Sequence, residues 1–330
     1  MLLVEIPQSL LKNELLKMDK LDLTTIILTY NEELHIRRCL ENVCPFSKKV
    51  FVIDSPSTDR TAEICKEFPN VEVVVHKYPG NQAKQFNWAL DHCEIGTEWV
   101  FRIDADEYCT PELIHEMQAK LPDLPKEVSA VVLPLGRVFR GRLLKHSIVN
   151  GVKMIRLFRY GKVRYEQRLM DEHLEVMEGG TVAFDNMFVD DNLMSIRGFI
   201  DKHNNYSSRE AALLLDAELE LCPLNNWEGD TAYAKDVAMK RAQKARYAKM
   251  PLYWRPLAYF FYRYVVKLGF LDGRAGFEWD FFQGLWYRLL VDSKVAEVRR
   301  FVKSNNIAVT TDEGKHRIKE YMKRNWNVSL

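Results

Sequence analysis

The sequence predicts an α/β domain with a mostly parallel central sheet and helices on both faces, followed by a helical carboxyl-terminal region. Between residues 23 and 136, short apolar runs of strand length alternate with stretches of helical composition. These runs are rich in β-branched residues and apolar on both faces, as strands buried in a parallel sheet are. From residue 195 onward the chain has helical character.

The elements follow from these patterns in chain order. Strands are expected at residues 24–30, 49–54, 71–75, 99–104 and 129–135. Helices are expected between them at residues 32–43, 60–68, 82–92 and 111–120, the last beginning with a Thr-Pro pair that is typical of a helix start. From residue 137 to 191, short runs separated by glycines predict hairpins and loops.

Composition narrows the class of protein. A length of 330 residues with 28% charged and 47% hydrophobic residues is typical of one or two globular domains. The formal net charge of +1 gives no global basic field that would recruit nucleic acid. No run of 18 or more apolar residues predicts a membrane span, and residues 1–22 carry too many acidic residues for a secretion signal. Six cysteines without CxxC spacing indicate reduced thiols in a cytoplasmic protein.

Polar and acidic side chains follow three of the predicted strands. Tyr30 and Glu32 follow the first strand, Asp54 ends the second, and Asp104 and Asp106 follow the fourth. In a parallel sheet, ligands bind outside the carboxyl ends of the strands, so these residues mark the candidate site. Residues i and i+2 of an extended segment point the same way, and two converging carboxylates favour a divalent cation that bridges a diphosphate.

Each residue also has a purely structural interpretation. Asn31 and Asp59 could cap the helices that follow them, and Asp54 could accept hydrogen bonds from loop amides. Lys84 would by default be a solvated helix lysine. Three acidic strand ends in chain order favour a shared ligand. Glycine-rich phosphate loops are absent from the sequence, so a metal ion and side chains would have to hold a phosphate.

Three segments resemble the amino-terminal half of family 2 inverting glycosyltransferases of the GT-A fold. They are TTIILTYNEE, VFVIDSPSTDRTAEI and GNQAKQFNWALDHCEIGTEWVFRIDADE, in the order and at about the spacing of that family. The carboxyl half resembles a bacterial subgroup that builds surface polysaccharides, through RLMDEHLEV, DKHNNYSSREA and KLGFLDGRAGFEWDFFQGLWYR.

The resemblance implies roles for particular residues. Tyr30 lies against the base of a nucleotide sugar, and Asp54 contacts the base or the ribose. Asp104 holds the ribose or sugar, and Asp106 ligates Mg²⁺ or Mn²⁺. The remaining implied donor-binding residues are Thr29, Glu32 and Lys84, the last near the diphosphate.

The resemblance also places the catalytic base in a short acidic motif beyond Asp-x-Asp. An inverting transfer needs one carboxylate that takes the proton of the acceptor hydroxyl. The motif here is MDEHL, with Glu172 as the expected base and Asp171 as the second candidate. The alternative is a charged surface loop in which His173 is structural.

An aromatic and basic segment covers residues 247–290. If residues 257–268 are helical, Arg263 and Lys267 share a face, and Gly269 ends the helix. Such a segment suits a helix that lies on an anionic bilayer. It equally suits a buried helical subdomain whose aromatic residues form a core or a dimer contact.

The resemblance implies a transferase that moves a hexose from a nucleotide-diphosphate sugar, expected to be a UDP-sugar, to a lipid-linked saccharide in surface polysaccharide or lipopolysaccharide assembly. The alternatives are an inactive membrane-associated scaffold and a sugar-nucleotide pyrophosphorylase. We expect an amino-terminal extension (1–22), a catalytic domain (23–194) and a helical region (195–330). Within the catalytic domain, residues 23–136 are expected to bind the donor, and residues 137–194 are expected to hold the acceptor and the base. The expected location is cytoplasmic, peripheral at the inner face of the cytoplasmic membrane, and a homo-oligomer is compatible with the sequence.

Overall fold

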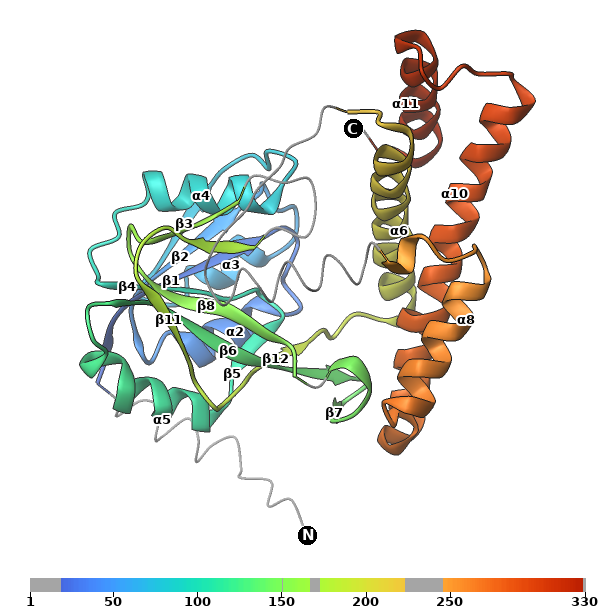
Figure 1. The fold of residues 1–330 in the computed structure, drawn as a ribbon. Helices are drawn as coiled ribbons and strands as arrows, with labels where there is room; N and C mark the ends of the chain where they lie inside the picture. The colour runs from blue at the N-terminus through green and yellow to red at the C-terminus, as the bar shows by residue number, and fades with distance from the viewer. Residues whose placement is uncertain (1–18, 150, 167–172, 223–245, 329–330) are drawn as a thin grey trace. The chain divides into compact units, whose positions relative to one another are not determined.

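The computed structural model describes residues 19–149, 151–166, 173–222 and 246–328. The chain divides into two compact units (Figure 1). The first unit holds residues up to Leu143 together with Val149–Leu193, and the second holds Leu144–Ile148 and the residues from Met194 onward. The finer predicted boundaries at residues 23, 137 and 195 stay predictions.

The first unit is built on a ten-stranded sheet with the order β3-β2-β1-β4-β8-β6-β12-β5, in which β7 and β11 also pair with β6. A separate two-stranded sheet pairs β9 with β10. The strands are β1 (Leu21–Thr29), β2 (Ser47–Asp54), β3 (Val71–Val75), β4 (Trp99–Arg102), β5 (Glu107–Cys109), β6 (Val128–Phe139), β7 (Arg142–Leu144), β8 (Lys153–Arg159), β9 (Val163–Tyr165), β10 (Leu174–Val176), β11 (Gly180–Ala183) and β12 (Phe188–Asp191).

The first four strands form the parallel part of the sheet. β1 pairs in parallel with β2 and β4, and β2 pairs in parallel with β3. Beyond β4 the sheet becomes mixed, because β8 runs antiparallel to both β4 and β6 and β12 runs antiparallel to β5. The predicted α/β class with a helical carboxyl-terminal region is confirmed, and the antiparallel pairings are the detail that the strand patterns did not reveal.

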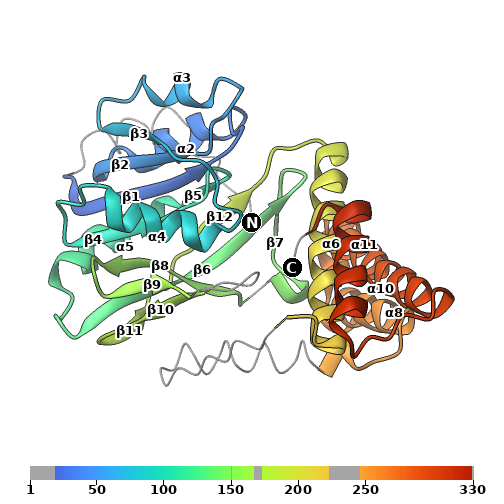
Figure 2. The same cartoon turned by 90° about the horizontal axis from the view of Figure 1, so that it is seen from above.

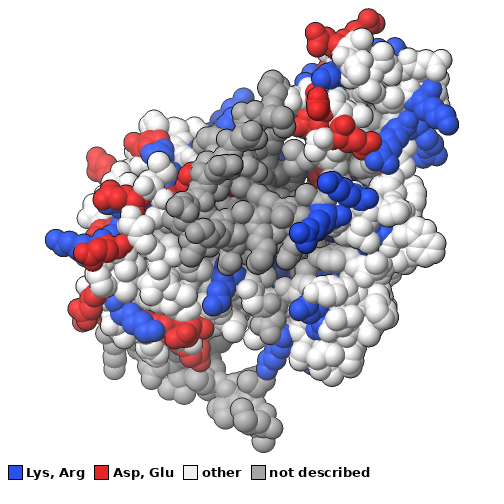
Figure 3. Space-filling view, viewed as in Figure 1, with Lys and Arg blue, Asp and Glu red and all other residues white. Residues whose placement is uncertain are grey.

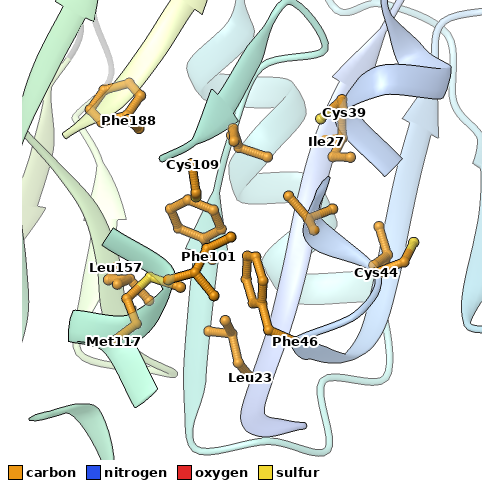
Figure 4. Close-up of a cluster of buried hydrophobic side chains, with 14 of the residues drawn as sticks. Leu23, Ile27, Cys39, Cys44, Phe46, Phe101, Cys109, Met117, Leu157 and Phe188 are labelled. Atoms are coloured by element: carbon orange, nitrogen blue, oxygen red, sulfur yellow. The ribbon is translucent and has the colours of Figure 1, made fainter. Parts of the chain in front are cut away.

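Helices cover both faces of this sheet. Figure 1 shows α4 on one face and α2 and α5 on the other. Side chains of α2, α3 and α5 pack with β1, β2 and β4 into one hydrophobic core, part of which is drawn in Figure 4. The helices are α2 (Ile36–Val43), α3 (Thr61–Cys65), α4 (Gln82–His92) and α5 (Pro111–Lys120), with a 3-10 turn at Leu121–Asp123.

Helix caps fix where α4 and α5 begin. The Asn81 side chain accepts a hydrogen bond from the backbone N–H of Lys84 at 3.0 Å. Thr110 accepts one from Leu113 at 3.3 Å, and Pro111 occupies the first turn. Short polar side chains before a helix satisfy backbone donors that have no partner within the helix, which explains why both predicted starts are correct.

The second unit is helical. Its helices α6, α10 and α11 pack side by side (Figure 2) around a core that includes Leu215, Val291, Val295 and Ile318. The elements are α6 (Ile196–Leu219), α8 (Trp254–Phe261), the π-helical segment η3 (Tyr262–Val266), the 3-10 turn η4 (Gly269–Asp272), α9 (Gly273–Trp279), the π-helical segment η5 (Asp280–Trp286), α10 (Tyr287–Ser304) and α11 (Asp312–Trp326).

The segment Leu144–Ile148 belongs to the helical unit although it follows strand β7. Asp272 accepts hydrogen bonds from the backbone N–H groups of Lys145 and His146 at 3.0 and 2.8 Å. The Ser147 hydroxyl donates to Asp280 at 2.6 Å. These buried carboxylates therefore anchor the segment through charge-assisted hydrogen bonds.

Arg263 and Lys267, which the sequence places on one helix face, differ in their surroundings. Arg263 is buried and its Nε donates to Asp280 at 2.8 Å, whereas Lys267 is exposed. A buried guanidinium needs a paired carboxylate, and Asp280 lies seventeen residues away in the sequence, so helical spacing could not reveal it. Residue 269 must be a glycine, because a Cβ at this position would lie 2.0 Å from an Asp280 carboxylate oxygen.

Two other predictions concern the cysteines and membrane-spanning helices. All six cysteines are thiols without a disulfide partner, as their spacing indicates. Within the described ranges, the structure holds no helix that is both long enough and apolar enough to cross a bilayer.

Candidate functional site

The carboxyl ends of β1 and β2 are joined by hydrogen bonds. Thr29 and Asp54 are register partners, and the Thr29 hydroxyl donates to Asp54 Oδ1 at 2.9 Å. Asp54 also accepts from the Ser57 hydroxyl at 2.6 Å and from the Ser57 backbone N–H at 2.9 Å. The buried Asp54 carboxylate therefore shapes the loop after β2, which is the structural role that the sequence left open.

The loop after β1 leaves Tyr30 exposed at the same edge. Its side chain is 62% exposed, as a ring that stacks on a planar ligand would have to be. Asn31 has φ = 56° and accepts a hydrogen bond from the backbone N–H of Thr58 at 2.8 Å. Glu32 does not point freely into solvent, because its Oε2 contacts His35 Nδ1 at 2.7 Å.

Asp104 is held by two arginines from neighbouring strands. Arg102 Nη2 donates to Asp104 Oδ1 at 2.9 Å, and Arg156 Nη2 approaches Asp104 Oδ2 at 3.4 Å. Both guanidinium groups are nearly inaccessible to solvent, whereas Asp104 is partly exposed. The carboxylate is thus fixed in position by two positively charged groups, and part of it stays accessible to solvent.

Glu107 also belongs to the cluster of Asp104, Arg102 and Arg156. It accepts a hydrogen bond from Arg156 Nη2 at 2.5 Å and from the backbone N–H of Asp104 at 2.8 Å. Burial raises the pKa of Glu107 to about 8. Burial alone would lower the pKa of Arg156, but Glu107 and Asp104 raise it above its usual value. Near pH 7 the Glu107 carboxyl is therefore mostly protonated, and the two side chains form a fully charged buried pair only above about pH 8.

Replacing Arg156 with methionine is expected to lower the free energy of unfolding by about 3–5 kcal/mol at pH 9 and by less at pH 6, because the Glu107 carboxylate that forms above its pKa then has no partner. The folded-state pKa of Glu107 lies above its ordinary value of 4.5, so the folded state favours the protonated acid. The stability of the unchanged protein therefore falls as the pH rises from 4.5 to about 8, and that of the variant, in which Glu107 lacks Arg156, continues to fall above pH 8. Urea unfolding at both pH values measures the effect. The double variant Glu107→Gln/Arg156→Met should remove most of the pH dependence, and an equal loss at both pH values would contradict the assignment.

Asp106 differs from Asp104 in its surroundings. Its Oδ2 accepts a hydrogen bond from Asn192 Nδ2 at 2.7 Å, and its backbone carbonyl accepts from the N–H of Asp191 at 3.0 Å. Within the part of the chain that the structure describes, its Oδ1 has no hydrogen-bond donor. A partly exposed carboxylate oxygen of this kind fits a hard divalent cation such as Mg²⁺ or Mn²⁺. No group of three or more His, Cys, Asp or Glu side chains among the described residues forms a complete metal cage.

A cavity of about 500 Å³ lies between α4 and the β9–β10 hairpin. The hairpin is tied to α4 because Asn87 Nδ2 donates to the carbonyl of Tyr165 at 2.9 Å, and the N–H of Tyr165 donates back to Asn87 Oδ1 at 3.0 Å. Lys84 is exposed and lines this cavity. The lining residues are Lys84, Asn87, Trp88, Asp91, His92, Arg164, Tyr165, Glu166, Glu175 and Met177.

Asp171 and Glu172 lie outside the described residues, between strands β9 and β10. The described residues on either side of this stretch contact each other. The backbone N–H of His173 donates to Glu166 Oε1 at 3.0 Å, and the N–H of Glu166 donates to the carbonyl of His173 at 3.1 Å. Glu166, the last described residue before this stretch, also lines the cavity beside Lys84.

The sequence interpretation missed several residues that complete the site. Arg102, Arg156, Glu107 and Asn192 contact Asp104 or Asp106 but come from three separate segments. A charged residue in the middle of an apolar strand run was the available signal for Arg102 and Arg156. For Asn192 no local pattern pointed to the site, because its position depends on the pairing of β12 with β5.

Comparisons with known proteins agree on a family. The family model described as Glycosyl transferase family 2 matches residues 24–186. The SPbeta prophage-derived glycosyltransferase SunS of Bacillus subtilis (strain 168) is 29% identical over 160 residues, which cover 47% of this chain and 36% of SunS. The lipopolysaccharide core biosynthesis glycosyltransferase LpsC of Rhizobium meliloti (strain 1021) is 30% identical over 156 residues, which cover 44% of this chain and 54% of LpsC.

The chain therefore spans between about a third and about half of the length of these two relatives. Among solved structures, the mannosyltransferase PcManGT from Pyrobaculum calidifontis in complex with GDP-Man and Mn²⁺ is 16% identical, with a TM-score of 0.44 over 88% of this chain and 93% of that chain.

Proposed function

We propose that this chain, which belongs to glycosyltransferase family 2 through its residues 24–186, is an inverting hexosyltransferase. In our proposal the donor is a nucleotide-diphosphate sugar, specifically a UDP-sugar, and the acceptor is a saccharide. The observation that carries this proposal is the group of acidic side chains at one edge of the sheet. Asp54, Asp104 and Asp106 follow strands whose parallel register brings their carboxyl ends together.

The donor occupies the edge formed by β1, β2 and β4. Tyr30 stacks against the base, and Asp54 contacts the base or the ribose while it shapes the loop around Ser57. Asp104, held by Arg102 and Arg156, hydrogen-bonds the ribose or the sugar. Thr29, Glu32 and Lys84 complete the donor site, with Lys84 near the diphosphate.

Asp106 holds Mg²⁺ or Mn²⁺ through the carboxylate oxygen that Asn192 does not occupy. When bound, the ion offsets the negative charge that develops on the leaving diphosphate. Glu172 takes the proton of the acceptor hydroxyl as that oxygen attacks the anomeric carbon from the face opposite the diphosphate. Asp171 is the second candidate for this role, and the acceptor enters the cavity between α4 and the β9–β10 hairpin.

We further propose that the acceptor is a lipid-linked saccharide of surface polysaccharide or lipopolysaccharide assembly, used at the inner face of the cytoplasmic membrane. The name of LpsC supports this class of pathway. An inactive scaffold is disfavoured because Asp104 and Asp106 keep an arrangement suited to a donor and a cation. A pyrophosphorylase would require a glycine-rich loop after β1, where the sequence has TYNEE instead.

A screen of nucleotide sugars tests the proposal. Thermal unfolding is recorded with UDP-, GDP-, ADP- and dTDP-sugars in the presence of Mn²⁺, because a ligand at a hundredfold excess over its Kd adds about 2.7 kcal/mol to the free energy of unfolding. We expect UDP-sugars to raise the unfolding temperature most and UDP to be released when a lipid-linked acceptor is added. Binding without release favours the scaffold, and the absence of any stabilisation contradicts the proposal.

A further inference from the structure

Helix α8 and segment η3 turn an apolar face toward solvent. The two elements are continuous, with eight residues followed by five. Their exposed positions recur at intervals of three and four residues, which places them on one side of the helix. These exposed residues are Trp254, Leu257, Ala258, Phe261, Tyr262, Val265 and Val266.

The opposite side of the same helix is buried and carries charge. Arg255 donates to Asp292 at 2.5 and 2.8 Å, and Arg263 donates to Asp280 at 2.8 Å. All four side chains are almost inaccessible to solvent. A surface helix of a protein in water normally shows the reverse pattern, with its apolar side in the core and its charges outside. This helix is therefore built for surroundings that are apolar on its outer side.

The apolar surface continues beyond the helix. Leu268, Phe270 and Leu271 in and before η4, and Phe277 in α9, are exposed as well. We call the exposed residues of α8 and η3, together with these four, the α8 face. In Figure 3 the lower right of the molecule, over α8, is largely white. An exposed patch of contiguous apolar residues marks a surface that binds a protein partner or a membrane.

The charges in this part of the chain have one predominant sign. Arg246, Lys249, Lys267 and Arg274 are exposed. Of the three acidic residues between positions 246 and 286, Asp272 and Asp280 are buried, and Glu278 pairs with Arg274 at 2.7 Å. Exposed basic residues beside an apolar helical face are the combination that binds anionic lipid surfaces, with each basic residue contributing about 1 kcal/mol.

We propose that the α8 face is the surface by which this protein docks on an anionic lipid bilayer. Trp254, Phe261 and Val266 enter the interface between headgroups and acyl chains, and Lys249 and Lys267 contact the lipid phosphates. The buried pairs of Arg255 and Arg263 keep the helix attached to its own unit while its outer side leaves water. This inference depends on the helical unit alone, so its test is independent of donor or acceptor chemistry.

Sedimentation with sucrose-loaded vesicles tests the proposal with the full chain and no substrate. Vesicles of phosphatidylcholine with phosphatidylglycerol are compared with vesicles of phosphatidylcholine alone. We expect binding to the anionic vesicles to be at least about tenfold tighter than to the neutral ones, and to weaken at high salt because ions screen the basic residues.

Matched variants separate the face from general surface effects. Val266 is 56% exposed on the α8 face, and Val75 is 64% exposed at the end of β3 in the first unit. We expect Phe261→Glu/Val266→Glu to weaken binding to anionic vesicles at least about tenfold, because two apolar side chains are replaced by anions. Val75→Glu should bind like the unchanged protein.

A second pair of double variants tests the basic residues. Lys249→Gln/Lys267→Gln should abolish the preference for anionic vesicles, whereas Lys323→Gln/Arg324→Gln on α11 should keep it.

Three outcomes would overturn the proposal. The first is no binding to either vesicle type by the unchanged protein. The second is that Val75→Glu weakens binding to anionic vesicles as much as Phe261→Glu/Val266→Glu does, while all variants unfold at the same temperature as the unchanged protein. The third is a dimer in sedimentation equilibrium that Phe261→Glu/Val266→Glu dissociates, together with no vesicle binding, since the face would then be covered by a second copy of the chain.

Discussion

Replacing Glu172 with glutamine is expected to lower the rate of sugar transfer at least about a hundredfold and to leave the affinity for the donor nearly unchanged. A general base contributes about 10²–10⁴ to the rate, and glutamine keeps the size of the side chain but cannot take the proton. The rate is measured as UDP release with saturating donor and acceptor. Donor affinity is measured separately by calorimetry, so that a loss of catalysis is distinguished from a loss of binding.

The matched control is Asp171→Asn, one residue earlier in the same stretch. We expect it to reduce the rate far less than Glu172→Gln if Glu172 is the base. Should Asp171→Asn stop transfer while Glu172→Gln turns over normally, the two roles are exchanged. Normal turnover by both variants would remove the MDEHL motif from the reaction.

Replacing Asp106 with alanine is expected to abolish metal-dependent binding of the nucleotide. In the proposed site Asp106 would supply a carboxylate oxygen to the cation, and the diphosphate would bind tightly only when its charge is offset. Calorimetry with UDP is run with Mn²⁺ and again with EDTA. The unchanged protein should bind UDP at least about tenfold more tightly with Mn²⁺, and Asp106→Ala should show the same weak affinity in both conditions.

Asp185→Ala is the control for this experiment, because Asp185 is an exposed acidic residue of the same unit whose carboxylate, among the described residues, pairs with Lys120 alone. It should retain the full effect of Mn²⁺. A metal effect of undiminished size in Asp106→Ala would show that another side chain binds the ion. The expected change is large because a single ligand is removed from a site that has few protein ligands.

Local elements could be predicted from the sequence because periodicity and caps act over a few residues. The strand at 71–75 and the helices at 82–92 and 111–120 have the predicted bounds. Asn81 and Thr110 explain the helix starts, since each satisfies a backbone donor within three residues. The convergence of Thr29 with Asp54 could be predicted too, because parallel strands bring their ends to one edge.

Contacts that depend on long-range pairing could not be predicted in this way. Arg156 reaches Glu107 because β8 inserts antiparallel beside β4, and nothing in either segment specifies that neighbour. The same reason explains why the sequence did not reveal the burial of Arg263, whose partner Asp280 lies on another element. Helical spacing identifies which residues share a side of a helix, but it does not tell which side is turned to solvent.

The attachment of Leu144–Ile148 to the helical unit limits how the protein can be divided for experiments. A chain truncated after residue 193 would keep this segment but lose Asp272 and Asp280, which accept its hydrogen bonds. Ser147, buried in the intact protein, would lose the Asp280 carboxylate to which its hydroxyl donates. Poor solubility of such a fragment would therefore reflect the lost hydrogen bonds of this segment and not an unstable sheet. A deletion that also removes Leu144–Ile148 is the better starting point for expression.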